Sequence, residues 1–173
     1  MPLPASLSPL FVSEHFKTAF RAHPAGVAVI TAAGTEGAVG LTASSVASVS
    51  ADPPILAFSV SGGRSASQIA AAQTVVVHLL GADQLELART FSIPGTPRFA
   101  GDMDWEMLPT GEPLLKGVPW ALRCEIVHRA ALGGSVLLAA TVLEVRSDPS
   151  GSDPLVYQDR AFHGLSPIAE FPP

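Results

Sequence analysis

The sequence is poor in several residue types, and each shortage excludes a class of protein. A single cysteine, Cys124, excludes an internal disulfide and a thiolate zinc cluster. Ten Lys and Arg against 15 Asp and Glu give a net charge of −5, which argues against a nucleic-acid-binding face. The first sixteen residues contain no Lys or Arg, and no apolar run approaches the roughly 18 residues of a transmembrane helix. These absences predict a cytoplasmic protein that binds neither nucleic acid nor membrane.

Charged residues are also scarce, at 14%, whereas 47% of residues are hydrophobic. This balance excludes intrinsic disorder, which requires low hydrophobicity and high charge. A chain of 173 residues suits one domain with a full core. We expect an irregular, proline-rich arm over residues 1–12 and a single domain over 13–173. Because so few charges cover a monomer poorly, the composition favours a homodimer.

The apolar patterns predict a mainly β protein. Strands are expected at 26–33, 38–50, 55–61, 74–80, 120–129, 135–145 and 154–157. Short helices are expected from Ser13, from Ser65 to about Ala72, and from Asp83 through Phe91. Since no long helices separate the strands, a small antiparallel barrel with short decorating helices fits better than a doubly wound sheet. The segment 135–145 is apolar on both faces, as expected under a helix in a barrel or in a dimer interface.

One loop has the components of a phosphate site. Residues 61–67 (Ser-Gly-Gly-Arg-Ser-Ala-Ser) join a strand to a helix and supply free backbone N–H groups, hydroxyls, a guanidinium and a helix N-terminus. Ser65 and Gln68 also have the spacing of a capping box. The alternative interpretation is a flexible loop with an ordinary helix cap.

A second segment, residues 40–50, is rich in hydroxyl groups: five of its eleven residues are Ser or Thr. Such a strand suits a surface on which a planar ligand lies against backbone N–H and hydroxyl groups. The alternative is an edge strand with one solvated face. Residues 92–119, rich in Gly and Pro, are expected to form a long loop of the kind that often serves function.

Other candidate chemistry is weak. The five histidines have no metal-ligand spacing, so no metal site is expected. No G-x-S-x-G or G-x-G-x-x-G motif occurs, which argues against a hydrolase elbow and a Rossmann fingerprint. Cys124 on an apolar strand face is interpreted as a packed core thiol. His78, which interrupts a run of Val and Leu, is interpreted as a core histidine with satisfied hydrogen bonds.

In their order along the chain, several motifs resemble the flavin reductase-like family. The most specific is Gly40-Leu-Thr-Ala-Ser-Ser-Val-Ala-Ser-Val-Ser50 followed by Asp-Pro-Pro, which is similar to the family's G-M-T-x-x-S-x-x-S-V-S-x-x-P-P. The others run from about Phe16 to Leu165 and include residues 24–31, 61–67, 87–91, 98–101, 111–117 and 154–157.

The resemblance implies an FMN-binding split β-barrel of Greek-key type. It implies an NAD(P)H:flavin oxidoreductase that reduces FMN or FAD and supplies the reduced flavin to a partner monooxygenase. Family members hold the flavin ring edge and ribityl chain with a strand end, which here is Thr42, Ala43, Ser44 and Ser45. The family's phosphate loop corresponds to Ser61, Arg64, Ser65 and Ser67. Ser59 is expected to lie close to the flavin ring, and Phe99 is expected to flank it.

The sequence departs from the family at the nicotinamide side. Where the family has Gly-Asp-His before its last long strand, this chain has Gly133-Gly134-Ser135, and a common family asparagine is His78 here. Hydride transfer needs proximity rather than a general base, so Ser135 is expected to keep one hydrogen-bonding group there. The alternative is a flavin-binding protein of this fold without efficient nicotinamide-driven reductase activity.

Overall fold

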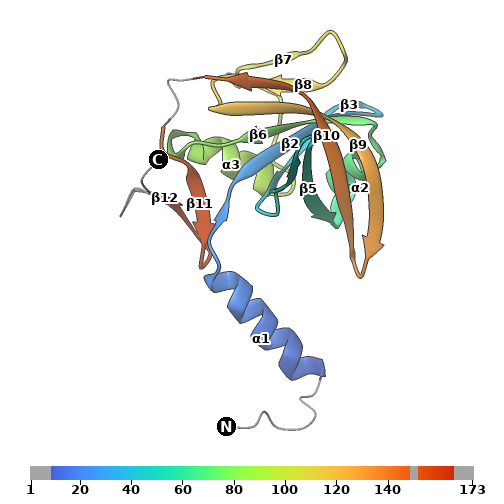
Figure 1. Cartoon of the computed structure of the whole chain (residues 1–173). Coiled ribbons are helices and arrows are strands. Elements are labelled where there is room, and N and C mark those ends of the chain that lie inside the picture. Colours follow the sequence, from blue (N-terminus) through green and yellow to red (C-terminus); the bar gives the residue numbers. More distant parts are fainter. Residues whose placement is uncertain (1–8, 149–151, 166–173) are drawn as a thin grey trace.

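The computed structural model describes residues 9–148 and 152–165 (Figure 1). Its helical segments are α1 (Pro9–Ala22), α2 (Gly63–Ala71), the 3-10 turn η1 (Ala82–Gln84) and α3 (Leu85–Ser92). Its strands are β1 (Ala25–Gly26), β2 (Ala28–Gly34), β3 (Gly37–Ala43), β4 (Ala47–Ala51), β5 (Pro54–Ser61), β6 (Thr74–Leu79), β7 (Trp105–Met107), β8 (Pro113–Leu115), β9 (Trp120–Leu132), β10 (Ser135–Ser147), β11 (Leu155–Gln158) and β12 (Ala161–Gly164).

Seven strands form the main sheet, in the order β3-β2-β6-β9-β10-β5-β4, and every pair is antiparallel. Two small sheets flank it, β1-β11-β12 and β7-β8. The expected mainly β, antiparallel architecture with short helices is confirmed. The decorating helices α2 and α3 both contact β2 and β3, and α2 also contacts β5.

The main sheet curls because its two edge strands follow one another in the chain. β3 ends at Ala43 and β4 begins at Ala47, yet they lie at opposite ends of the strand order. Three linking residues span at most roughly 14 Å between these two positions, so the edges approach each other at that point. Among the described residues no strand ladder joins β3 to β4, which leaves a barrel split along this seam.

The sheet separates two hydrophobic cores. Because side chains alternate along a strand, Ile30 of β2 enters the core beneath α2, with Phe58 and Ile69. Its neighbour Val29 enters the other core, which contains Phe91 of α3 and Leu115 of β8. Together the two cores fix the strands whose ends carry the site.

Three expectations from the sequence are corrected here. Residues 38–50 do not form one strand, because the chain turns at 44–46 from one sheet edge to the other. The first helix begins at Pro9 rather than Ser13, so part of the predicted arm is helical; residues 1–8 lie outside the described residues. Ser65 and Gln68 do not form a capping box, because α2 begins at Gly63 after the N-cap Gly62.

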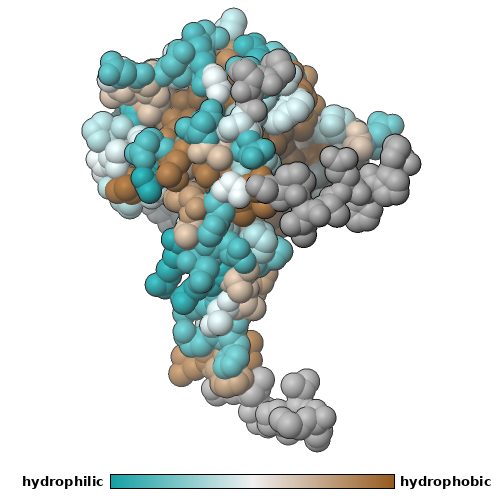
Figure 2. All heavy atoms as spheres, turned by 90° about the vertical axis from the view of Figure 1, so that its left-hand side faces the viewer, coloured by the Kyte–Doolittle hydropathy of each residue, from teal (hydrophilic) through white to brown (hydrophobic). Residues whose placement is uncertain are grey.

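Helix α1 projects away from the sheets, and none of its side chains is buried (Figure 1). Only its C-terminal end touches the body of the molecule, where the Asp159 N–H donates to the Arg21 carbonyl at 2.8 Å. The face shown in Figure 2 is largely hydrophilic along this helix and hydrophobic towards its far end. Among the described residues, no helix is long and apolar enough to span a bilayer.

Candidate functional site

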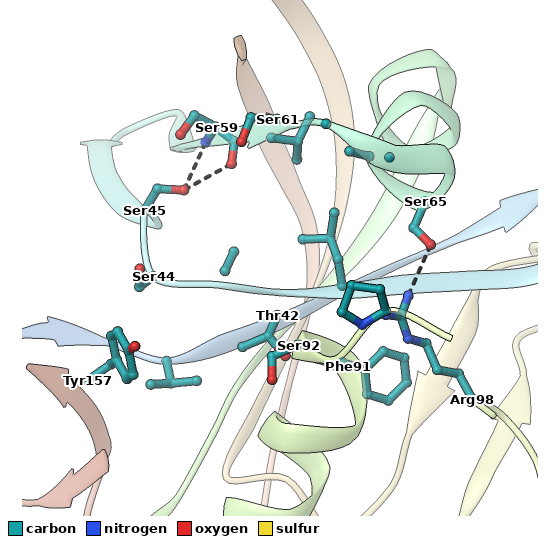
Figure 3. A pocket seen from close by; sticks show the side chains of 18 of the residues that line it. Thr42, Ser44, Ser45, Ser59, Ser61, Ser65, Phe91, Ser92, Arg98 and Tyr157 are labelled. Carbon is teal, nitrogen blue, oxygen red and sulfur yellow. Dashed lines mark hydrogen bonds between the residues drawn. The ribbon is translucent and has the colours of Figure 1, made fainter. Parts of the chain in front are cut away.

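A cavity of about 840 Å³ opens between β3 and β5, next to the link from β3 to β4 (Figure 3). Its walls come from β3, β5, the start of α2, the segment after α3, and the β11–β12 hairpin. The lining residues are Val27, Leu41, Thr42, Ala43, Ser44, Ser45, Ser59, Val60, Ser61, Gly62, Gly63, Arg64, Ser65, Ala66, Phe91, Ser92, Pro94, Gly95, Arg98, Tyr157, Arg160 and Phe162.

One end of the cavity is the N-terminus of α2. Gly62 and Gly63 have positive φ values of 61° and 77°, a conformation that side chains disfavour, and they turn β5 sharply into the helix. The helix has no side-chain cap, so its first N–H groups and the positive end of its dipole are available at the cavity. Arg64 and Ser65 in the first turn add a guanidinium and a hydroxyl. This end of the cavity is suited to a phosphate group.

Arg98 fixes this end of the cavity in place. Its Nη1 donates to the Ser65 hydroxyl at 3.0 Å and to the Gly40 carbonyl at 2.7 Å (Figure 3). Nη2 donates to the Ile93 carbonyl at 3.2 Å, and the guanidinium stacks 5.8 Å from the centre of the Phe91 ring. Burial lowers the pKa of Arg98, but arginine remains charged in proteins. Arg98 therefore joins α2, β3 and the segment after α3, and adds positive charge beside the helix end.

Arg64 is held differently, because its guanidinium pairs with the carboxylate of Glu36 in the β2–β3 turn. Both side chains are largely exposed, so this ion pair is weak and exchangeable. An anion at the α2 N-terminus would compete with Glu36 for Arg64.

The middle of the cavity follows the hydroxyl-rich strand end. The Ser45 hydroxyl donates to the Ser59 carbonyl at 3.1 Å and accepts from the Ser59 N–H at 3.0 Å, which ties the β3–β4 link to β5 (Figure 3). The Thr42 hydroxyl donates to the Ala88 carbonyl of α3 at 2.7 Å. These two hydroxyls therefore shape the wall, whereas Ser44 and Ser61 have exposed side chains at the cavity.

Eight of the eleven residues predicted for the site line the cavity: Thr42, Ala43, Ser44, Ser45, Ser59, Ser61, Arg64 and Ser65. Three do not. Ser67 turns back along α2, where its hydroxyl donates to the Gly63 carbonyl at 3.2 Å. Phe99 packs edge-on against Phe91 and Trp105, so it supports the wall from behind. Ser135 starts β10 directly opposite Ser61 in the strand register, next to the cavity but outside its lining.

The sequence did not predict the residues at the end of the cavity opposite α2. Tyr157, Arg160 and Phe162 come from the β11–β12 hairpin, and Tyr157 lies across the cavity from Ser65 in Figure 3. The expected strand ended at Tyr157, and no return strand was predicted. Residues 158–160 (Gln-Asp-Arg) lack the Asn-Gly or Gly pattern that would have signalled a tight hairpin.

Apart from Arg98, the described groups with displaced pKa values lie outside the cavity lining. His78 and Cys124 are completely buried in the two cores, as interpreted from the sequence. Burial lowers the pKa of His78 to about 4 and raises that of Cys124 to about 12. The cavity lining contains no Asp, Glu, His or Cys, and no metal-binding cluster occurs among the described residues. The lining therefore offers no carboxyl, imidazole or thiol group for acid–base chemistry, and its α2 end is suited to an anion.

Comparison with known proteins agrees with this geometry. The family described as "Flavin reductase like domain" matches residues 20–166. An NADH:FMN oxidoreductase of Rhodococcus qingshengii is 35% identical over 159 residues, which cover 90% of this chain and 83% of the relative.

Two solved structures share the fold. A flavin reductase domain protein from Arthrobacter sp. FB24 has a TM-score of 0.85 and 36% identity, covering 91% of this chain and 98% of its own. The styrene monooxygenase flavin reductase (SMOB) of Pseudomonas putida S12 has a TM-score of 0.79 and 26% identity, covering 90% and 99%. The family match spans most of the chain and both cavity-forming strands, and the chain belongs to the flavin reductase-like domain family.

Proposed function

We propose that this protein is an NADH:flavin oxidoreductase. Its flavin substrate is FMN, or FAD bound through the riboflavin phosphate part that the two flavins share. The observation that carries the proposal is the cavity itself, which has a phosphate-type end at α2 and a lining without carboxylates, histidines or thiols. Hydride transfer between two cofactors requires proximity and orientation rather than acid–base side chains. The relative named NADH:FMN oxidoreductase supports both the reaction and the choice of NADH as donor.

The residues present fit a flavin. The α2 N-terminus, Ser61, Arg64 and Ser65 would hold the phosphate, with Arg98 fixing Ser65. The backbone and hydroxyls of residues 42–45 would line the ring edge and ribityl chain. When bound, the flavin supplies the chemistry by accepting a hydride from the nicotinamide. The protein binds, orients and shields the two reactants.

Ser135 is our candidate for the nicotinamide side. Its backbone pairs with Ser61 at the end of β5, so it sits at the cavity edge next to the phosphate loop. A hydroxyl there can donate a hydrogen bond to a carboxamide, and it cannot act as a general base at neutral pH. Its role would be to position the donor.

The reduced flavin would leave the protein and serve a partner monooxygenase. Lining residues such as Ser44 and Arg64 are exposed, so the cavity is open to solvent. An open cavity suits a flavin that binds and dissociates as a substrate. SMOB, named as a styrene monooxygenase flavin reductase, supports this type of partner. We expect the cytoplasm, where NADH is generated, as the location.

We further propose that residues 13–173 act as one domain and that two copies form a homodimer. Val12, Phe16 and Phe20 form a row at i, i+4 spacing on α1, and Phe16 and Phe20 are 59% and 62% exposed. An isolated 14-residue helix is marginal in water, so a covered apolar face is needed to stabilise it. The hairpin of β9 and β10 also exposes Val127, Leu137 and Leu143. Of the two alternatives for segment 135–145, these exposed side chains favour a dimer interface.

The experiment is a pair of binding titrations followed by steady-state turnover. Binding should quench the fluorescence of the flavin. The dissociation constant of FMN should be at least tenfold lower than that of riboflavin, because only FMN carries the phosphate that α2 and Arg64 would bind. NADH oxidation should then depend on added FMN. Arg64→Gln should weaken FMN binding about tenfold and leave riboflavin binding unchanged. Lys17→Gln, on the exposed helix α1, is the matched charge control.

Equal affinity for FMN and riboflavin would refute the phosphate assignment. Tight FMN binding without NADH- or NADPH-driven turnover would instead identify the flavin-binding alternative, in which Gly134 and Ser135 mark the loss of reductase activity.

A further inference from the structure

The β11–β12 hairpin places a cation at the end of the cavity opposite α2. Tyr157 pairs with Phe162 and Gln158 pairs with Ala161, so Asp159 and Arg160 form the two-residue turn. Tyr157, Arg160 and Phe162 all line the cavity. Among the described residues, the Arg160 guanidinium has no hydrogen-bond or ion-pair partner, in contrast to Arg64 and Arg98. Its positive charge is therefore available to a ligand in the cavity.

The backbone at this turn is strained. Asp159 and Arg160 have φ values of 50° and 63°, in the left-handed region that favours glycine. Two-residue hairpin turns with this geometry usually contain Asn-Gly. Such strain is characteristic of ligand-binding positions, where the side chain contributes more to function than its conformation costs. The fold retains an arginine where glycine would be easier.

The rest of the chain holds the turn in position without a ligand. The Asp159 N–H donates to the Arg21 carbonyl at 2.8 Å, and Gln158 Nε2 donates to the Ala22 carbonyl at 2.7 Å. Ala25 of β1 pairs with Tyr157, whose ring lies 5.1 Å from that of Phe162. The end of α1 and β1 therefore preorganise Arg160 at the cavity, so its side chain has a defined place to act from.

A cavity with cations at both ends suits two separate phosphate-bearing groups. The α2 end is assigned to the flavin phosphate under the proposed function, on which this inference rests. We propose that Arg160 binds the pyrophosphate of a dinucleotide and so determines affinity for that ligand. A planar guanidinium matches the geometry of phosphate oxygens and forms charge-assisted hydrogen bonds with them. Two reactants of this protein carry that group: the nicotinamide dinucleotide donor and the ADP half of FAD.

The test compares Arg160→Gln with wild type in three measurements: the dissociation constants of FMN and FAD, and the KM for NADH at saturating FMN. Loss of a charge-assisted hydrogen bond to phosphate should cost about tenfold or more. If the donor is the ligand, the KM for NADH rises about tenfold and both flavin constants stay within twofold. If FAD is the ligand, FAD binding weakens about tenfold and FMN binding does not change. Either result supports the proposal and identifies the source of the pyrophosphate.

Two further variants separate binding from structure. Arg160→Gly relieves the strained turn, so it should raise the melting temperature. It should nevertheless weaken dinucleotide binding as much as Arg160→Gln does. A merely structural role would not give effects of opposite sign. Arg146→Gln removes the same charge from β10, outside the cavity lining and away from the turn, and should leave all three constants unchanged.

The proposal is overturned if Arg160→Gln leaves both the KM for NADH and the FAD constant within twofold of wild type. It is also overturned if Arg146→Gln produces the same loss, since general charge would then explain the effect. Failure of the proposed function itself is distinguishable, because it would appear in wild type as an absence of FMN binding or of turnover.

Discussion

His78 shows how one buried side chain joins the main sheet to the small β7–β8 sheet. Its Nδ1 lies 3.0 Å from the Val29 carbonyl, and its Nε2 accepts from the Leu115 N–H at 3.0 Å. Because a carbonyl only accepts and an amide N–H only donates, the ring is neutral with its proton on Nδ1. The histidine thereby connects β2 and β6 to β8 and closes the core behind the site.

We predict a pH-dependent loss of stability from this residue. The pKa of His78 is about 4 when folded and near 6.5 when unfolded, so the unfolded chain binds the extra proton between these values. The contribution of neutral His78 is complete above pH 6.5 and is lost as pH falls towards 4, by roughly 3 kcal/mol.

Urea unfolding at pH 4.5 and 7, for wild type and His78→Asn, measures this effect. The pH dependence should be clearly flatter in the variant, although the variant is less stable overall. Parallel pH profiles for the two proteins would show that His78 does not titrate as described.

Glu36 is predicted to weaken flavin phosphate binding by holding Arg64. Glu36→Gln should lower the FMN dissociation constant by up to about fivefold, because an exposed ion pair is worth at most about 1 kcal/mol. Riboflavin, which lacks the phosphate, serves as the control ligand and should bind unchanged. Weaker FMN binding in this variant would mean that Glu36 orients Arg64 instead of competing for it.

At the scale of elements, the close approach of β3 and α3 controls one cavity wall. Gly40 lies under the Phe91 ring, where an added Cβ would come within 2.5 Å of a ring carbon. Phe91 is 1% exposed and lines the cavity, so it has little room to move. A glycine here is a packing requirement rather than a turn requirement.

Gly40→Ala is therefore predicted to destabilise the protein by about 1–3 kcal/mol through overpacking, and to weaken FMN binding. Gly26→Ala is the matched control, since Gly26 has ordinary φ and open space around its Cα, and it should cost much less. Chemical denaturation of both variants gives the comparison. Equal losses would mean that strand propensity, and not contact with Phe91, determines the cost.

Local sequence predicted most strands of the main sheet and the strand-to-helix loop at 61–67, because their patterns depend on residues close together in the chain. It did not predict the break at 44–46, since only the strand order reveals that β3 and β4 lie on opposite edges. Phe99 was expected at the flavin because it belongs to the family motif at 98–101, but with a positive φ of 58° it packs against Phe91 and Trp105. The Arg160 end of the cavity depends on pairing between segments about 130 residues apart, β1 and β11, which no local pattern encodes.

For the whole molecule, the exposed row on α1 predicts a dimer that depends on this helix. Phe16 and Phe20, which are 59% and 62% exposed, each offer roughly 100 Å² of apolar surface, and a two-fold interface counts them twice. That total, roughly 400 Å², is below the roughly 1,000 Å² expected of a specific interface, so Val12 and the exposed side chains of β9 and β10 must contribute the rest.

Light scattering should find wild type dimeric at micromolar concentration and the double variant Phe16→Ser, Phe20→Ser largely monomeric. A variant at Glu14 and Lys17, which pair with each other on the same helix, serves as the control and should stay dimeric. A monomeric wild type would refute the dimer. A dimeric double variant would place the interface elsewhere, on the β9–β10 hairpin.

The central claim is that this cavity brings NADH and a flavin together for reduction. The most direct measurement is anaerobic: FMN and NADH are mixed with the purified protein, and the absorbance of oxidised flavin is followed. We expect the oxidised flavin to bleach far faster than in the protein-free control, and the rate to fall when Arg64 is replaced by Gln. FMN that binds but stays oxidised with both NADH and NADPH would contradict it, and would mean that the fold serves flavin binding or another reductant.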